Sequence, residues 1–210
     1  MFRIFEKIQL KKLKRNKDDK YAEYIDTQYE RSKNKLSTTA IEKKKYLTSL
    51  LSKYVDLPKT SRILVIGCRD SYELDLLEEL GAKRVIGIDL FSSDKRICVM
   101  DMHAMEFSDN TFDVLYCSHA LEHSLEYEKA IDEITRVVKN RGVIVIEVPV
   151  NFTPSKFEIN DFGEASKILE AFSKSVEISE VYIKENLKNG DVNNFDGTDI
   201  SRVIFKIVKQ

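Results

Sequence analysis

Two apolar runs of the chain each end in a residue that suits the binding of a nucleoside. Residues 62–66 lead into Gly67, and residues 84–88 lead into Asp89, which stands 22 residues after Gly67. A glycine lets a ligand approach the backbone closely, and an acid at this distance can accept hydrogen bonds from both hydroxyls of a ribose. The pattern predicts a site for a nucleoside-containing cofactor and leaves two classes open, a dinucleotide and S-adenosylmethionine (SAM).

The turn after the first run, Gly67-Cys-Arg-Asp-Ser-Tyr-Glu73, helps to separate these two classes. A dinucleotide site of the G-x-G-x-x-G type needs glycine where this chain has Arg69 and Tyr72, so a nicotinamide oxidoreductase is disfavoured. Asp70 and Glu73 have the spacing of a capping box. This spacing predicts that a helix begins here and that further backbone N–H groups remain for the carboxylate of a ligand.

A longer stretch carries an ordered set of motifs. It reads Val99-Met-Asp-Met-His-Ala-Met-Glu-Phe-Ser-Asp-Asn-Thr-Phe-Asp-Val-Leu-Tyr-Cys-Ser-His-Ala-Leu-Glu-His123, followed by Glu133-Ile-Thr-Arg-Val-Val-Lys-Asn-Arg-Gly-Val-Ile-Val-Ile-Glu-Val-Pro149. The sequence resembles the class I SAM-dependent methyltransferases, most closely the group with a short acidic turn after the third strand, a D-N-x-F-D motif and a following L-E-H. The resemblance covers residues 62–150 and implies a Rossmann-like fold and methyl transfer from SAM.

The resemblance also implies roles for the matching positions. The loop that begins at Gly67 would hold the methionine part of SAM, and Asp89 would bind the ribose hydroxyls. Asp101, with the backbone of Met102, would lie at the adenine, and the residues after the fourth strand would lie near the sulfonium. The predicted cofactor-binding residues are Gly67, Cys68, Arg69, Asp89, Leu90, Asp101, Met102, His103 and Ser118, and the candidate catalytic residues are His119 and His123. Histidine suits a general base because neutral imidazole is available near pH 7.

The chain departs from the family pattern at two places. Arg69 and Ser71 stand where the family carries glycine, and Asn140-Arg-Gly142 stands where it carries P-G-G. The lost glycines support an alternative in which the protein binds SAM without turnover, as a scaffold or partner protein.

Structural roles are also open for several of these residues. Residues 119–123 spell H-x-x-E-H, a zinc-protease signature, but a zinc site needs a helix through both histidines, and His119 directly follows a strand. We therefore predict no metal site. His123 also suits a residue that braces the next helix, and Asp89 and Asp101 also suit turns. Because both aspartates stand at the carboxyl ends of predicted strands, where ligands bind in such folds, we favour the binding role for them.

The elements that carry these residues alternate between strands and helices after Pro58. We expect strands at 62–66, 84–88, 97–100, 112–117, 143–148, 176–184 and 201–208, and helices at 72–80, 126–138 and 164–172. Apolar strands separated by helices predict an α/β fold, a Rossmann-like doubly wound and mostly parallel sheet. No helical pattern fits residues 186–199, so the last two strands are expected to form an antiparallel pair at one end of the sheet.

The N-terminal part of the chain has a different composition. Apolar residues spaced by three and four predict two or three amphipathic helices, the last at about 38–55. They form a basic helical extension, residues 1–58, before a SAM-binding domain at 59–210. Residues 1–60 carry 16 Lys and Arg against 8 Asp and Glu, whereas the rest of the chain carries 18 against 27. This basic front suits a solvated face or contact of residues 1–20 with an anionic membrane surface, and nucleic acid is an unlikely partner.

Composition limits the remaining classes. With 210 residues, of which 42% are hydrophobic, the chain can bury a core. The three cysteines stand in apolar runs without a C-x-x-C spacing, which predicts buried thiols in a reducing compartment rather than disulfides or a zinc ribbon. Neither a signal peptide nor a membrane-spanning stretch is recognisable, so we expect a cytoplasmic protein.

The sequence thus predicts a SAM-dependent methyltransferase with a small molecule or a sugar, such as a glycan precursor, as its acceptor. The loops at 149–163 and 186–199 are expected to bind that acceptor. Besides the SAM-binding protein without turnover, a nucleic-acid methyltransferase that uses the basic N-terminus remains an alternative. The sequence does not indicate the oligomeric state.

Overall fold

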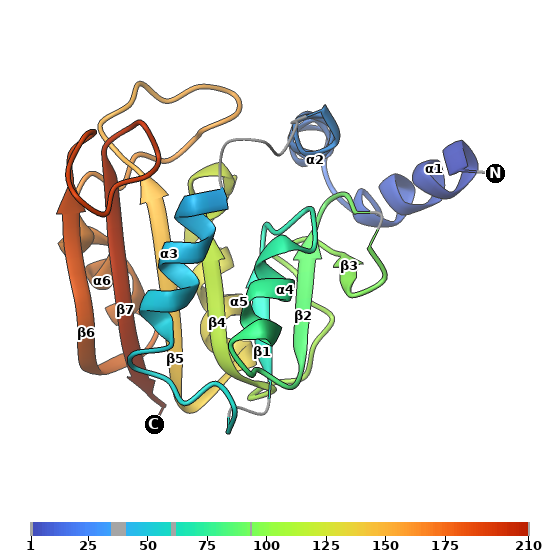
Figure 1. Ribbon diagram of the computed structural model, residues 1–210. Coiled ribbons are helices and arrows are strands. Elements are labelled where there is room, and N and C mark those ends of the chain that lie inside the picture. The colour runs from blue at the N-terminus through green and yellow to red at the C-terminus, as the bar shows by residue number, and fades with distance from the viewer. Residues whose placement is uncertain (1, 35–40, 60–61, 93, 210) are drawn as a thin grey trace.

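The computed structural model describes residues 2–34, 41–59, 62–92 and 94–209 (Figure 1). A seven-stranded sheet with the order β3-β2-β1-β4-β5-β7-β6 forms its centre. The strands are β1 Ile63–Ile66, β2 Val85–Asp89, β3 Ile97–Val99, β4 Phe112–Ser118, β5 Val138–Pro149, β6 Glu177–Leu187 and β7 Ile200–Val208. β1 to β5 pair in parallel, and β7 pairs antiparallel with both β5 and β6. The predicted fold class is confirmed, including the antiparallel strands at one end.

Helices cover both faces of the sheet. They are α1 Phe2–Leu13, α2 Asp19–Asn34, α3 Ile41–Leu51, α4 Tyr72–Glu79, the short 3-10 helix η1 Leu121–His123, α5 Tyr127–Val137 and α6 Ala165–Ser173. Alternate residues of β4 belong to two separate cores: Leu115 and Cys117 pack with α5 and α6, and Val114 and Tyr116 pack with α3 and α4. This alternation follows from the two-residue period of a strand, and it makes β4 apolar on both sides.

The N-terminal segment takes part in this architecture. Leu47 and Leu51 of α3 are fully buried in the same core as Leu74 of α4, so α3 is one of the helices that cover the sheet. α2 lies across the carboxyl ends of the parallel strands, and α1 extends away from the sheet (Figure 1). A third, smaller core of Leu13, Tyr21, Tyr24 and Ile25 joins α1 and α2.

Two details differ from the sequence-based expectation. β5 begins at Val138, where a helix was expected to end, because Val138 already pairs with Phe112 before a register shift in the ladder. Cys98 is exposed, whereas Cys68 and Cys117 are buried as expected. In the part of the chain that the structure describes, no helix combines the length and apolar character needed to cross a membrane.

Candidate functional site

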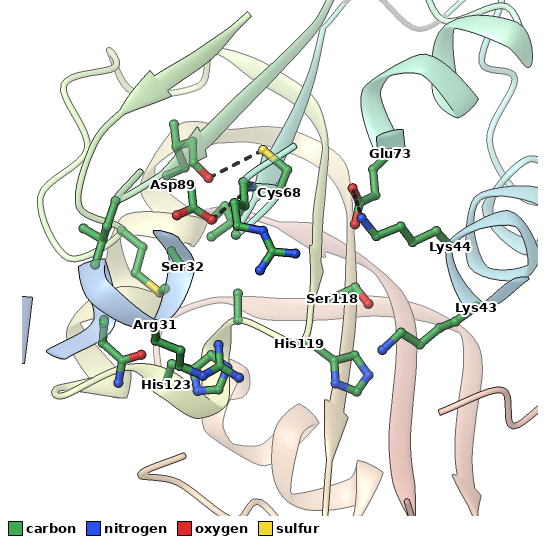
Figure 2. A pocket seen from close by; sticks show the side chains of 18 of the residues that line it. Arg31, Ser32, Lys43, Lys44, Cys68, Glu73, Asp89, Ser118, His119 and His123 are labelled. Carbon is green, nitrogen blue, oxygen red and sulfur yellow. Dashed lines mark hydrogen bonds and ion pairs between the residues drawn. The ribbon is translucent and has the colours of Figure 1, made fainter. Parts of the chain in front are cut away.

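A cavity of about 310 Å³ lies at the carboxyl ends of β1, β2 and β4, beneath α2 and α3 (Figure 2). It is lined by most of the predicted site residues, namely Gly67, Cys68, Arg69, Asp89, Leu90, Met102, Ser118, His119 and His123. We call the lining residues between positions 66 and 123 the floor. We call the lining residues from α2, α3 and the loop after β6 the roof; these are Tyr24, Gln28, Arg31, Ser32, Lys43, Lys44 and Asp196.

Gly67 occupies a position that only glycine fits. Its φ is +76°, and a Cβ built on it would lie 2.4 Å from the Cβ of Ala120. Its N–H donates to the carbonyl of Ile88 at 2.9 Å. The chain after β1 is thus pressed against the chain after β4, and no side chain at position 67 separates the backbone from the cavity.

Asp89 presents a buried carboxylate to the floor. Its two oxygens accept the backbone N–H groups of Arg69 at 3.0 Å and Phe91 at 3.1 Å, and the Ser32 side chain of the roof also bonds to it. Burial raises the pKa of Asp89, although the bonds from Phe91, Ser32 and Arg69 act in the opposite direction. Arg69 has a φ of +36°, so it adopts a backbone conformation that favours the glycine it replaces and still donates to Asp89.

The predicted capping box does not form, because Lys44 of the roof pairs with the carboxylates of both Asp70 and Glu73. Helix α4 begins at Tyr72, whose N–H donates to Asp70 at 3.2 Å. The Lys44 ammonium lies 3.1 Å from Asp70 and 2.9 Å from Glu73. Sequence reasoning missed this contact, since the run of three lysines at 43–45 does not show which of them turns inward.

Asp101 and His103 do not line the cavity. Asp101 lies under α2, where its carboxylate accepts the Tyr21 hydroxyl at 2.8 Å and the His103 Nδ1–H at 2.6 Å. The Nε2 of His103 lies 2.6 Å from the Ser124 hydroxyl, and the rings of Tyr21 and Tyr24 pack edge-on against the imidazole. Together these groups connect the end of β3 to α2. The neighbouring Met102 does line the cavity.

His119 directly follows β4 in a left-handed conformation, with φ +53°, and its side chain reaches the cavity. Its Nε2 lies 3.5 Å from Glu147 and 3.7 Å from Asp196. Glu147 is fully buried and pairs with Arg202 at 2.6 Å. Burial acts to raise the pKa of Glu147, but His119 and Arg202 outweigh it and the pKa lies below its ordinary value. Sequence reasoning overlooked Glu147, although a carboxylate inside the apolar run 143–148 was a usable signal.

His123 is held more firmly than His119. Its Nδ1–H donates to the carbonyl of Phe157 at 2.8 Å, and its Nε2 lies 3.3 Å from the buried Glu122 carboxylate. The H-x-x-E-H segment is not one helix, since His119 is left-handed and only residues 121–123 form a 3-10 turn. Within the described ranges, no three His, Cys, Asp or Glu side chains gather as a metal site would require.

Comparison with known proteins shows what this geometry is similar to. Residues 64–146 match the family model described as a methyltransferase domain. The protein MJ0638 of Methanocaldococcus jannaschii is 33% identical over 120 residues, which cover 54% of this chain and 52% of that protein. The chain therefore spans about half the length of the curated relative it matches.

Solved structures share the fold. The 1,6-didemethyltoxoflavin-N1-methyltransferase of Burkholderia thailandensis, solved with 1,6-didemethyltoxoflavin and S-adenosylhomocysteine, aligns with a TM-score of 0.67 at 13% identity, covering 90% of each chain. The cyclase SpnF aligns with a TM-score of 0.62 at 16% identity, covering 79% of this chain and 81% of its own. At these identities the likeness concerns the fold.

The segment that matches the methyltransferase model supplies the floor of the cavity and not its roof. Arg31, Ser32, Lys43 and Lys44 precede the matched segment, and Asp196 follows it. Sequence reasoning located the floor from motifs and expected the loop 186–199, which contains Asp196, to bind the acceptor, but it did not name Arg31, Ser32, Lys43 or Lys44 as site residues. The site therefore joins a segment with family motifs to flanking segments whose contribution depends on the tertiary fold.

Proposed function

We propose that the protein is a SAM-dependent methyltransferase whose acceptor is a small molecule or a sugar, such as a glycan precursor. One observation carries the proposal: the cavity lies between the Asp89 carboxylate and the glycine turn at Gly67, on the segment that matches the methyltransferase model. In open α/β sheets, ligands bind beyond the carboxyl ends of the strands at this switch point. A volume of about 310 Å³ falls at the lower end of the range for small-molecule sites.

The residues of the floor fit such a cofactor. Gly67 leaves the backbone open to the methionine part, and Asp89 offers a carboxylate for the ribose hydroxyls, which would take the place of the Ser32 hydroxyl. Leu90 and Met102 line the cavity on the side of Asp89 and suit the adenine ring. The Arg69 guanidinium, next to the glycine turn, suits the carboxylate of the cofactor.

The chemistry required of the chain is mainly positioning. SAM supplies a methyl group that its sulfonium has already activated. Holding the acceptor in line with that group can contribute about 7–11 kcal/mol of barrier lowering. When the acceptor is a hydroxyl or an amine, His119, which lines the cavity, would take its proton, and the Glu147 and Asp196 carboxylates, 3.5 and 3.7 Å from its Nε2, would stabilise the imidazolium that forms. His123, fixed by Phe157 and Glu122, serves to hold the site in shape.

The similar structures support the proposal without deciding the reaction. The Burkholderia enzyme is described with a small heterocyclic molecule and S-adenosylhomocysteine bound, which agrees with a small acceptor. SpnF is described as a cyclase, so the same fold also serves other chemistry. A direct test of the cofactor and of methyl transfer is therefore needed.

A ligand panel tests the cofactor. SAM, S-adenosylhomocysteine, NAD and NADP are added to the wild type, Asp89→Ala and Asp94→Ala, and the melting temperature is followed. We expect only the two adenosyl-sulfur compounds to raise it, in the wild type and in Asp94→Ala but not in Asp89→Ala. Asp94 is a matched control because it stands in the same loop after β2 and does not line the cavity. Stabilisation by NAD or NADP alone would restore the oxidoreductase alternative.

A second measurement tests turnover. Transfer of a radiolabelled methyl group from SAM is followed with pools of small molecules, sugars and sugar nucleotides, and with nucleic acids as a separate pool. Labelling of a small molecule or sugar supports the proposal. Labelling of nucleic acid alone supports the nucleic-acid alternative, and ligand stabilisation without any labelling supports a SAM-binding protein without turnover.

A further inference from the structure

Four cationic side chains line the cavity, and they differ in how well they are paired. Lys43 lies 2.5 Å from Asp196, and Lys44 lies 2.9 Å from Glu73. Within the described residues, the ion pairs of Arg31 and Arg69 are long: Arg31 lies 3.7 Å from Glu158, and Arg69 lies 3.8 Å from Asp70. Close carboxylates thus neutralise both lysines, whereas both guanidinium groups have N–H donors that no carboxylate in the described residues accepts at hydrogen-bond distance.

The Arg31 guanidinium is partly withdrawn from water without a close carboxylate to offset the loss of hydration. Its side chain is only 21% exposed, while Glu158 is itself 42% exposed. Burial, together with the nearby positive charge of Arg69, lowers the pKa of Arg31, against the favourable charges of Glu122 and Glu158. A guanidinium withdrawn from water and left without a close carboxylate gains most from an incoming anion, because such pairs form two parallel, charge-assisted hydrogen bonds.

The helix around Arg31 is fixed in place. Gln28, one turn earlier on α2 and 4% exposed, donates its side-chain N–H to the carbonyl of Phe157 at 2.9 Å. The same carbonyl accepts the Nδ1–H of His123 at 2.8 Å. One carbonyl of the 149–163 loop thus connects α2 to η1. The charge of Arg31 interacts with Glu122, the buried carboxylate that lies 3.3 Å from His123 Nε2.

We propose that the methyl acceptor carries an anionic group, a carboxylate or a phosphate, and that Arg31 binds this group and selects for it. The proposal rests on the proposed function, since it assigns the acceptor to this cavity. The cofactor brings one carboxylate, and Arg69, next to the glycine turn and the N–H donor to Asp89, is placed for it. Arg31 reaches the cavity from α2, and its charge interacts with Glu122, the buried carboxylate that lies 3.9 Å from His119 Nδ1 and 3.3 Å from His123 Nε2, so Arg31 is placed for an anionic group of an acceptor that reacts near these histidines.

Anion binding to the protein saturated with S-adenosylhomocysteine tests the assignment. Calorimetric titrations compare inorganic phosphate, glucose 1-phosphate with glucose, and benzoate with benzamide, on the wild type, Arg31→Gln and Arg31→Lys. We expect at least one of the anions to bind the wild type, its neutral counterpart to bind less tightly, and Arg31→Gln to bind the anion about tenfold more weakly or worse. Arg31→Lys should fall between them, since lysine keeps the charge without the planar fork. Preference for the phosphates or for benzoate separates the two anion classes.

Two controls make the result decisive. Arg84→Gln changes an exposed arginine at the amino end of β2, far from the cavity lining, and should bind anions as the wild type does. The affinity for S-adenosylhomocysteine should change less than about threefold in Arg31→Gln. A loss of tenfold or more in that affinity would assign Arg31 to the cofactor and overturn the proposal, as would equal anion binding by Arg31→Gln and the wild type or no anion binding at all. If S-adenosylhomocysteine does not bind the wild type, the proposed function fails, whereas the anion titration of the cofactor-free protein still decides the anion site.

Discussion

The floor and the roof of the cavity are held in different ways. The floor is fixed mainly by backbone N–H groups: that of Gly67 donates to the carbonyl of Ile88, that of His119 to the carbonyl of Glu147, and that of Arg69 to the Asp89 carboxylate. The roof is held by side chains that reach across from distant segments, such as Lys43 to Asp196 and Gln28 to Phe157. Backbone contacts tolerate changes of residue type, as Arg69 in place of glycine illustrates, whereas side-chain contacts change with each substitution. The floor therefore suits recognition of an invariant cofactor, and the roof suits recognition of a particular acceptor.

Because the floor rests on the sheet, we expect the largest loss of stability from a substitution in the sheet beneath it. Arg202 is 1% exposed and pairs with the fully buried Glu147 at 2.6 Å. Arg202→Met would leave that carboxylate buried without its main partner, which should cost about 3–5 kcal/mol in the free energy of unfolding. Lys59→Met, which removes one partner of the solvent-exposed pair with Asp56, should leave the free energy of unfolding nearly unchanged. Urea unfolding measures both.

A second substitution separates loss of charge pairing from loss of packing. In the double variant Glu147→Gln with Arg202→Met, no buried carboxylate remains unpaired, so part of the lost stability should return. If Arg202→Met alone unfolds at the same urea concentration as Lys59→Met, the buried pair does not hold the floor together.

A smaller effect is expected at the glycine turn. Gly67→Ala places a methyl group against Ala120 at a φ of +76°, so it adds overpacking to backbone strain, and it should cost roughly 2–4 kcal/mol. Gly190→Ala is a matched control, because Gly190 has a φ of +90° in the loop after β6 and no atom within 4 Å of the added group. It should cost only the strain, about 1–2 kcal/mol. Urea unfolding and binding of S-adenosylhomocysteine should both be more impaired in Gly67→Ala; equal losses in the two variants contradict a tight turn.

The features that the sequence predicts well are those with a local physical signature. Apolar β-branched runs and the breaks between them predicted the sheet, and Gly67 and Asp89 stand at the strand ends where the motifs placed them. Alternating helices and strands determine which strand ends meet, so Gly67 and Asp89 could be placed from spacing, whereas the roles of Met102, Ser118 and His119 came from the family resemblance.

What the sequence did not show depends on contacts between distant segments. Lys44 takes the two carboxylates of the expected capping box from a helix that is separated from them by more than twenty residues, and nothing in the run 43–45 indicates this. Arg31 and Asp196 reach the cavity from α2 and from the loop after β6, two segments that no local motif connects. Asp101 and His103 lie beneath α2 because Tyr21 and Tyr24 pack on them, and the position of α2 is a tertiary property.

The smallest predicted effect concerns Asp101, and it also tests whether this residue contacts the cofactor. Burial acts to raise the pKa of Asp101, but the bonds from His103 and Tyr21 outweigh it, so its pKa in the folded protein lies below the unfolded value of about 3.9. A carboxyl group with a lowered pKa stabilises the fold above its unfolded pKa and loses that contribution as the pH falls through the acid range. Asp101→Asn should therefore cost about 1 kcal/mol at pH 7, since asparagine keeps one acceptor oxygen, and the difference from the wild type should shrink towards pH 3. Urea unfolding at several pH values measures this.

The same variant distinguishes a structural from a cofactor-binding Asp101. The carboxylate is occupied by His103 and Tyr21, with Lys17 at 3.9 Å, and does not line the cavity, so Asp101→Asn should bind S-adenosylhomocysteine within about threefold of the wild type. Asp89→Asn is the matched comparison, because it makes the same change at a carboxylate that does line the cavity, and there the affinity should fall by about tenfold or more. If both variants lose affinity equally, Asp101 reaches the adenine in the bound state, and α2 must move to allow it. In that case the position of α2, a roof helix, would determine whether Asp101 can bind the cofactor.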